Sequence, residues 1–141
     1  MSVLVFLINS TWGIIQSALG LVIFLRFIHK PHYRYKGSII TTNATPFIFK
    51  GAMSLGVFIF IFKDVHYDKE QLFESYLAKH EYGHCLQSVL LGPLYLLVIG
   101  IPSLTWCILF ANWRKRTGKG YSWLYTESWA DRWGGVERTN P

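Results

Sequence analysis

The sequence predicts an α+β membrane protein built as one domain over residues 1–141. Three observations favour this fold class. Hydrophobic residues make up 51% of the chain and charged residues 16%, whereas a soluble domain usually carries about 25% charged residues. Apolar residues are gathered into long runs, and a segment rich in β-branched and aromatic residues separates the first run from a helical pattern. A soluble protein with an aromatic-rich core is the alternative that composition leaves open.

The positive charge is concentrated beside the apolar runs. The net charge is +6, and basic residues cluster at Arg26–Lys36 and Arg114–Lys119, each directly after an apolar run. Basic flanks of this kind are the positive-inside signal and attract anionic headgroups. No basic helix or RNA-binding signature accompanies them. The charge pattern therefore predicts membrane lipid, and not nucleic acid, as a partner.

The first half of the chain divides into an apolar helix and a strand region. Residues 3–28 are apolar and long enough for a transmembrane helix, because a bilayer core is about 30 Å thick. Residues 37–63 are rich in Ile, Thr, Phe and Val, which predicts two strands around a turn at Asn43–Pro46. Within them, Val57–Phe62 is too short to cross a membrane as a helix and is expected to be a strand.

Three helical segments are expected in the second half. Residues 68–91 show helical periodicity, with Asp68 as the N-cap. Residues 94–112 form a re-entrant or hairpin apolar segment, bent near Gly100–Ser103. A final helix covers residues 123–133 and ends at a pair of glycines.

A metal-binding motif lies on the helix over residues 68–91. His80-Glu81-Tyr82-Gly83-His84 has the form HExxH. Residues four apart lie on one face of a helix, so both imidazoles can reach one zinc ion at about 2 Å. Glu81 lies one position further round, where it can take a proton from zinc-bound water as a general base. The alternative is that the two histidines share a packed helix by coincidence and bind no metal.

A catalytic zinc site needs a third protein ligand. The pattern HExxHxxGxxH is excluded because positions 87 and 90 are Gln and Leu, and no His follows His84. The remaining downstream candidates are Glu127, Asp131 and Glu137. Glu127 and Asp131 have the spacing ExxxD, which places both carboxylates on one helix face. One can bind the metal while the other accepts the free ring N–H of a ligand histidine.

HEYGH (80–84) followed by ESWADR (127–132) resembles the gluzincin pattern of zinc metallopeptidases. The form ExxADR is similar to the membrane-bound group of CAAX prenyl endopeptidases and bacterial heat-shock membrane peptidases. The resemblance implies a zincin-like fold with one Zn²⁺, held by His80, His84 and Glu127. It also implies Asp131 as the residue that orients a ligand histidine. The protein is expected in the bacterial cytoplasmic membrane, and the two basic clusters would place the active site on the cytoplasmic side.

The predicted function is that of a membrane-embedded zinc metalloendopeptidase that cleaves a peptide or membrane-protein substrate at the membrane interface. The hydroxyls of Tyr121 and Tyr125 are candidate donors to the developing oxyanion. Gluzincins carry a substrate-binding edge strand upstream of the metal helix, and the residues in that position are Ser54, Leu55, Gly56, Val57 and Phe58. The alternatives are a non-catalytic metal-binding membrane adaptor and a small metal carrier.

One zinc site also sets a condition on topology. His84 and Glu127 must lie on the same side of the membrane, so residues 94–112 have to return to the side from which they start. The sequence therefore predicts residues 29–91 and 113–141 on one face of the membrane and the amino-terminal end on the other.

Overall fold

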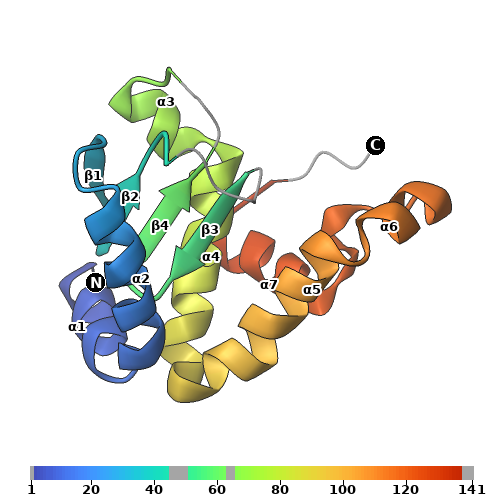
Figure 1. Cartoon of the computed structure of the whole chain (residues 1–141), viewed down its shortest axis with the longest axis horizontal. Helices are drawn as coiled ribbons and strands as arrows, with labels where there is room; N and C mark the ends of the chain where they lie inside the picture. Colours follow the sequence, from blue (N-terminus) through green and yellow to red (C-terminus); the bar gives the residue numbers. More distant parts are fainter. Residues whose placement is uncertain (1, 45–50, 63–65, 138–141) are drawn as a thin grey trace.

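A computed structural model describes residues 2–44, 51–62 and 66–137 of the chain. A four-stranded sheet lies at the centre, with the helix α2 (Ile14–Arg26) on one face and α4 (Tyr76–Leu91) on the other. The helix α7 (Tyr125–Gly134) packs against α4 on the side away from the sheet (Figure 1). The mixed helix and strand content confirms the α+β prediction.

The sheet consists of two hairpins joined by a parallel pair. Its strands are β1 (His32–Tyr35), β2 (Ser38–Thr41), β3 (Ala52–Leu55) and β4 (Phe58–Ile61), in the order β1-β2-β4-β3. β2 and β4 are parallel, and the other two pairs are antiparallel. The turn between β1 and β2 uses Lys36 and Gly37, both at positive φ, which matches the twist of a two-residue hairpin.

The prediction of strands in this region was therefore confirmed, but the strands are more numerous and begin earlier than predicted. The described residues form four strands instead of two, and the first begins at His32, before the predicted start at residue 37. The expected strand Val57–Phe62 is confirmed as β4, whose four residues are all buried. Its alternating side chains fill two cores, because Ile59 and Ile61 face α4 while Phe58 and Phe60 face α2. Residues 45–50 and 63 of the predicted turn and strand region lie outside the described residues.

The prediction of one continuous helix over residues 3–28 was wrong. The segment forms two helices, α1 (Ser2–Thr11) and α2, with a bend of 97° between them. The bend carries Ser2 back to the hairpin turn, where a Cβ on Gly37 would overlap the Ser2 carbonyl oxygen. Two residues in direct contact cannot lie on opposite faces of a membrane, so the predicted separation of the amino-terminal end from residues 29–91 was also wrong.

The metal-motif segment contains a short helix before the long one. Residues 68–91 form α3 (Lys69–Glu74) and α4, separated by Ser75. Asp68 caps α3 as predicted, in a capping box with Gln71. Ser75 then caps α4 through its side chain, which accepts a hydrogen bond from the Ala78 amide. The predicted continuous helix is broken because Ser75 adopts an extended backbone conformation between the two helices.

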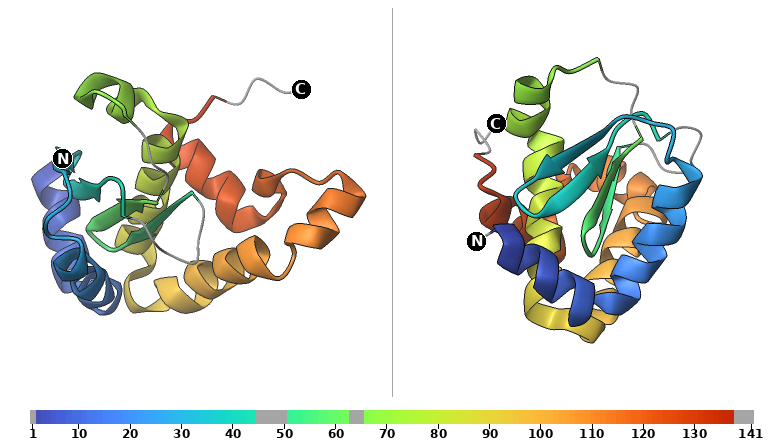
Figure 2. Two further views of the ribbon diagram at one scale, coloured as in Figure 1. Left: turned by 45° about the horizontal axis from the view of Figure 1, so that its top comes forward. Right: turned by 90° about the vertical axis from the view of Figure 1, so that its left-hand side faces the viewer.

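The predicted bend at Gly100–Ser103 was wrong as well. After a 3₁₀ turn, η1 (Gly92–Leu94), a π-helical turn, η2 (Leu96–Gly100), runs on into α5 (Ile101–Ile108). The chain bends by 67° only after Ile108, before α6 (Ala111–Thr117). It then returns through a second 3₁₀ turn, η3 (Tyr121–Trp123), to α7, which closely matches the predicted final helix over 123–133 (Figures 1 and 2).

No single helix in the described part of the chain is both long and apolar enough to cross a bilayer. Two bent pairs, α1 with α2 and the run Leu96–Ile108 with α6, reach the required length and composition only when each pair is taken together.

Candidate metal centre

The candidate site forms where α4 and α7 come into backbone contact. A Cβ on Gly83, inside the HExxH motif, would overlap the carbonyl oxygen of Ala130 on α7. One turn away, a Cβ on Gly134 would overlap the carbonyl oxygen of Lys79 on α4. The absence of side chains at these two glycines lets the helices approach closely. The close approach brings Glu127 of α7 to the two histidines of α4.

His80, His84 and Glu127 converge on one point and are all buried. The Oε2 atom of Glu127 lies 3.1 Å from Nε2 of His80 and 3.5 Å from Nε2 of His84. Ligand atoms about 2.0–2.2 Å from a tetrahedral zinc ion are roughly 3.3–3.5 Å apart. The two distances from Glu127 lie near this spacing, and this group could hold a metal ion.

The other ring nitrogen of each histidine has a hydrogen-bond partner. Nδ1 of His80 lies 2.7 Å from Oδ1 of Asp131, and Nδ1 of His84 lies 2.7 Å from Oε1 of Gln87. Both partners accept, so each Nδ1 donates a proton, and each Nε2 faces Glu127, where its lone pair would serve a bound metal ion. Such partners orient imidazole ligands in metal sites. Asp131 thus occupies the place that the sequence predicted for it.

Sequence reasoning missed Gln87. It was used only to exclude a third histidine, yet it is fully buried and supports His84 in the same way that Asp131 supports His80. Its amide nitrogen also donates to the carbonyl oxygen of Thr126 at 2.9 Å, which links α4 to the start of α7. The signal was available in the spacing, because residues three apart share a helix face.

A second missed pair holds the Glu127 carboxylate. The Thr126 hydroxyl donates to Oε1 of Glu127 at 3.2 Å, and the hydroxyl of Ser103 donates to Thr126 at 2.9 Å. Oε1 is occupied in this way, while Oε2 faces the histidines. The apolar helix α5 therefore helps to orient the third ligand through Ser103.

The charges at the site are strongly coupled. Burial alone would lower the pKa of His80, but the hydrogen bonds to Asp131 and Glu127 outweigh it and raise this pKa to about 10. Burial alone would raise the pKa of Glu127, but hydrogen bonds from His80 and His84 outweigh it and hold this pKa far below the usual range. Without a metal, the site therefore holds a protonated imidazole beside an ionised carboxylate. A divalent cation can replace that proton.

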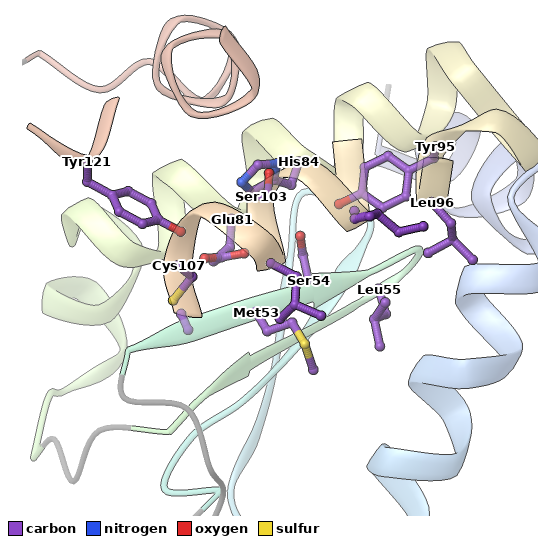
Figure 3. A pocket seen from close by; sticks show the side chains of 14 residues that line it. Met53, Ser54, Leu55, Glu81, His84, Tyr95, Leu96, Ser103, Cys107 and Tyr121 are labelled. Atoms are coloured by element: carbon purple, nitrogen blue, oxygen red, sulfur yellow. The ribbon is translucent and has the colours of Figure 1, made fainter. Parts of the chain in front are cut away.

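Glu81 lies beside the histidines and lines a cavity of about 330 Å³ (Figure 3). Burial raises the pKa of Glu81, and the nearby His84 and His80 offset part of that rise. Ser54 of β3 points from the sheet toward Glu81 (Figure 3). Its buried hydroxyl has no hydrogen-bond partner within normal geometry among the described residues, yet it lies close enough to help lower the pKa of Glu81.

Of the two tyrosines predicted to act on an oxyanion, only Tyr121 reaches the cavity. Tyr121 lines it, and its hydroxyl points inward on the side of Glu81 (Figure 3). Burial raises the pKa of Tyr121, so its hydroxyl stays protonated. Tyr125 is 49% exposed and donates its hydroxyl to the carbonyl oxygen of Val98 at 2.6 Å. The structure does not bring Tyr125 to the cavity.

The predicted edge strand is displaced along the chain. Ser54 and Leu55 lie on β3, which is an edge strand and borders the cavity, but Gly56 and Val57 lie between the strands. Phe58 belongs to β4, an inner strand with partners on both sides. The accessible edge is thus Ala52–Leu55, and the prediction for Gly56, Val57 and Phe58 was wrong.

No known protein-family model, curated protein or solved structure matches this chain. Two imidazoles and a carboxylate form a group that could hold a metal ion, and a buried carboxylate lies beside them at a cavity. A metal-ion ligand set next to a candidate base and an open space is the arrangement used in metal-assisted hydrolysis.

Proposed function

We propose that this protein is a zinc-dependent endopeptidase. One observation carries the proposal: the buried group His80, His84 and Glu127 lies beside Glu81, and His84 and Glu81 both line the same cavity. A purely structural zinc site is closed by four protein ligands, whereas a catalytic one keeps three and leaves a position open. Three candidate ligands beside a cavity fit the catalytic kind.

The donor set suits zinc. Two neutral imidazoles and a carboxylate form one of the common catalytic zinc sets, and both imidazoles have Nδ1 partners that leave Nε2 for the metal. When bound, zinc supplies Lewis-acid polarisation of a carbonyl oxygen and lowers the pKa of water.

Glu81 would act as the general base. Its carboxylate accepts a proton from the attacking water and later donates that proton to the leaving nitrogen. A raised pKa brings a carboxylate closer to neutral pH, where proton transfer in both directions is efficient. Tyr121, protonated and facing the cavity, would donate a hydrogen bond to the negatively charged oxygen that forms from the carbonyl.

The cavity favours an extended peptide with an apolar side chain. Helix α5 and the turn before it supply Leu96, Ile101, Leu104 and Cys107 to its wall, and the edge strand β3 borders it. A peptide added to β3 would gain main-chain hydrogen bonds without strict sequence demands. The apolar wall would then select the side chain beside the scissile bond.

The decisive experiment compares Glu81→Gln with the wild-type protein. Gln keeps the shape of the side chain but cannot accept the proton, so zinc content should stay the same while hydrolysis of an apolar peptide is lost. Glu70→Gln is the matched control, because Glu70 is an exposed carboxylate on α3 away from the cavity. Equal turnover by wild type and Glu81→Gln would overturn the catalytic proposal.

A further inference from the structure

Two bends of the chain meet at one corner of the molecule. The turn between α1 and α2 lies against the turn that follows α4, because a Cβ on Gly92 would overlap the indole nitrogen of Trp12. The side-chain amide of Gln16 fastens the two turns by donating to Ser88 Oγ at 2.8 Å and to the Gly92 carbonyl oxygen at 2.9 Å. Figures 1 and 2 show the two bends side by side.

The surface of this corner is apolar. Residues 2–25 and 85–113, which build it, contain no Asp, Glu, Lys, Arg or His. Large apolar side chains project from both bends, with exposed fractions of 52% for Trp12 and 65% for Leu97. The other exposed apolar side chains nearest the bends are Ile14, Ile15, Leu90, Leu94 and Val98. An exposed apolar patch of this kind needs a covering partner.

Basic residues begin where the apolar helices end, and two exposed tryptophans lie beside one of the basic groups. α2 runs 13 residues from the corner to Arg26, and Lys30 follows. On the other side, the helical run Leu96–Ile108 is followed by α6, which carries Arg114, Lys115 and Arg116. Trp113 and Trp123 are exposed in the same region. An apolar corner followed by tryptophans and cations matches the layers of a bilayer from acyl chains to anionic headgroups.

The dimensions fit one leaflet. A helix rises 1.5 Å per residue, so α1 is about 15 Å long and α2 about 20 Å. With 97° between them, each would stand near 45° to the membrane normal and reach a depth of roughly 10–14 Å. Half of the hydrocarbon core is about 15 Å.

Neither apolar pair can complete a crossing. Ser2, the first residue of α1, lies in contact with Gly37, which follows the end of α2. His84 and Glu127, on opposite sides of the second pair, meet at the metal centre. Both segments must therefore leave the membrane on the side from which they enter.

We propose that the protein is a monotopic membrane protein that inserts this corner into one leaflet. Residues 2, 34 and 117 then all lie on the same side of the membrane. The occupant of the apolar surface is the acyl-chain region of a bilayer with anionic headgroups. The cations beside the corner favour this partner over a second copy of the chain, because two copies joined there would bring like charges together. The inference does not depend on catalysis.

The first test measures sidedness. Full-length protein with Cys85→Ala and Cys107→Ala receives one new cysteine, as Ser2→Cys, Arg34→Cys or Thr117→Cys, all at exposed positions. Each variant is added to preformed vesicles of phosphatidylcholine and phosphatidylglycerol and treated with an impermeant maleimide. All three should react from outside. Protection of residue 2 while residue 34 reacts would demonstrate a crossing and overturn the proposal.

The second test measures depth and charge. A bimane label at Ile15→Cys or Leu97→Cys should be quenched by lipids brominated in their acyl chains, whereas one at the control position Lys69→Cys should not. Lys115→Gln and Arg116→Gln should each weaken binding about five-fold to anionic vesicles but not to pure phosphatidylcholine. Absence of quenching at both corner positions, or a discrete dimer that does not bind vesicles, would overturn the proposal. Neither readout requires bound zinc or activity.

Discussion

Gly83 lies directly against the backbone of Ala130, so the residue before the second histidine of HEYGH sets the distance between the two helices that carry the candidate metal ligands. The histidines come from one helix and the carboxylate from the other. A small change in this helix–helix distance moves Glu127 relative to both imidazoles.

Gly83→Ala should therefore weaken both folding and metal binding. The added methyl group would meet the Ala130 carbonyl, and relief requires α7 to move away, at a cost of roughly 1–3 kcal/mol or more. Thermal unfolding with a chelator reports the stability, and zinc content after dialysis reports the site. Gly120→Ala is the control, since a Cβ there meets no atom within 4 Å. Equal effects of the two variants would show that the contact is unimportant.

Glu127→Ala should lower zinc occupancy far more than Glu137→Ala. Glu127 is fully buried with its Oε2 between the two histidines, whereas Glu137 is exposed beyond the end of α7. Loss of a direct ligand should exceed the 10–100-fold loss of affinity typical of supporting residues. Metal analysis of the two purified variants checks this, and similar zinc contents would mean that Glu127 is not the third ligand.

Gln87→Leu should weaken zinc binding about 10–100-fold without unfolding the protein. The substitution leaves Nδ1 of His84 without its acceptor and the Thr126 carbonyl without its donor. Gln87→Glu is the matched variant, because it restores the acceptor for His84 but not the donor for Thr126. Affinity measured by chelator competition should be higher for Gln87→Glu than for Gln87→Leu. The reverse order would remove Gln87 from the support of His84.

The sequence could predict the site residues whose relative positions depend only on short spacing along one helix. His80 and His84 share a helix face, as do Glu127 and Asp131, and spacing alone places each pair. The bend at residues 12–13 depends instead on contacts distant in sequence, where Trp12 lies against Gly92 and Gln16 binds its carbonyl. No local pattern encodes that packing.

At Pro102 the sequence predicted a bend that the structure does not have. A proline inside an apolar segment favours a bend, but Pro102 lies in the first turn of α5, where the missing N–H is least costly. A π-helical turn precedes α5, and the helix axis continues to Ile108 without the predicted bend. The position of the proline relative to a helix start, which the sequence did not reveal, decided the outcome.

Zinc affinity should rise with pH. In the metal-free protein His80 has its pKa raised to about 10 and is protonated at neutral pH, so zinc must displace a proton. The affinity should increase about ten-fold per pH unit below that pKa. The folding stability of the metal-free protein should change in the opposite direction and fall as the pH rises. The stabilisation by protonated His80 is complete below pH 6.5 and is lost as the pH rises toward 10.

Chelator competition at several pH values between 6.5 and 8.5 measures this dependence. Asp131→Asn is the comparison, because removing the carboxylate on Nδ1 should lower the pKa of His80 and flatten the slope. A pH-independent affinity of the wild-type protein would mean that no proton leaves the site when zinc binds.

Cys107 should report on occupation of the cavity. Of the two cysteines, Cys107 lines the cavity and is partly exposed, whereas Cys85 is fully buried with its pKa raised by burial to about 12. A small thiol reagent should therefore modify Cys107 alone, since reaction requires both access to the thiol and its ionisation to thiolate.

A peptide hydroxamate with an apolar side chain, which binds zinc through its hydroxamate, should slow the modification of Cys107. The same peptide with an acidic side chain should protect much less, because burying a carboxylate against Leu96 and Leu104 carries a desolvation cost. Mass spectrometry of the labelled protein gives the rates, and Cys107→Ala confirms the site. Equal protection by the two hydroxamates would show that this cavity does not select apolar side chains.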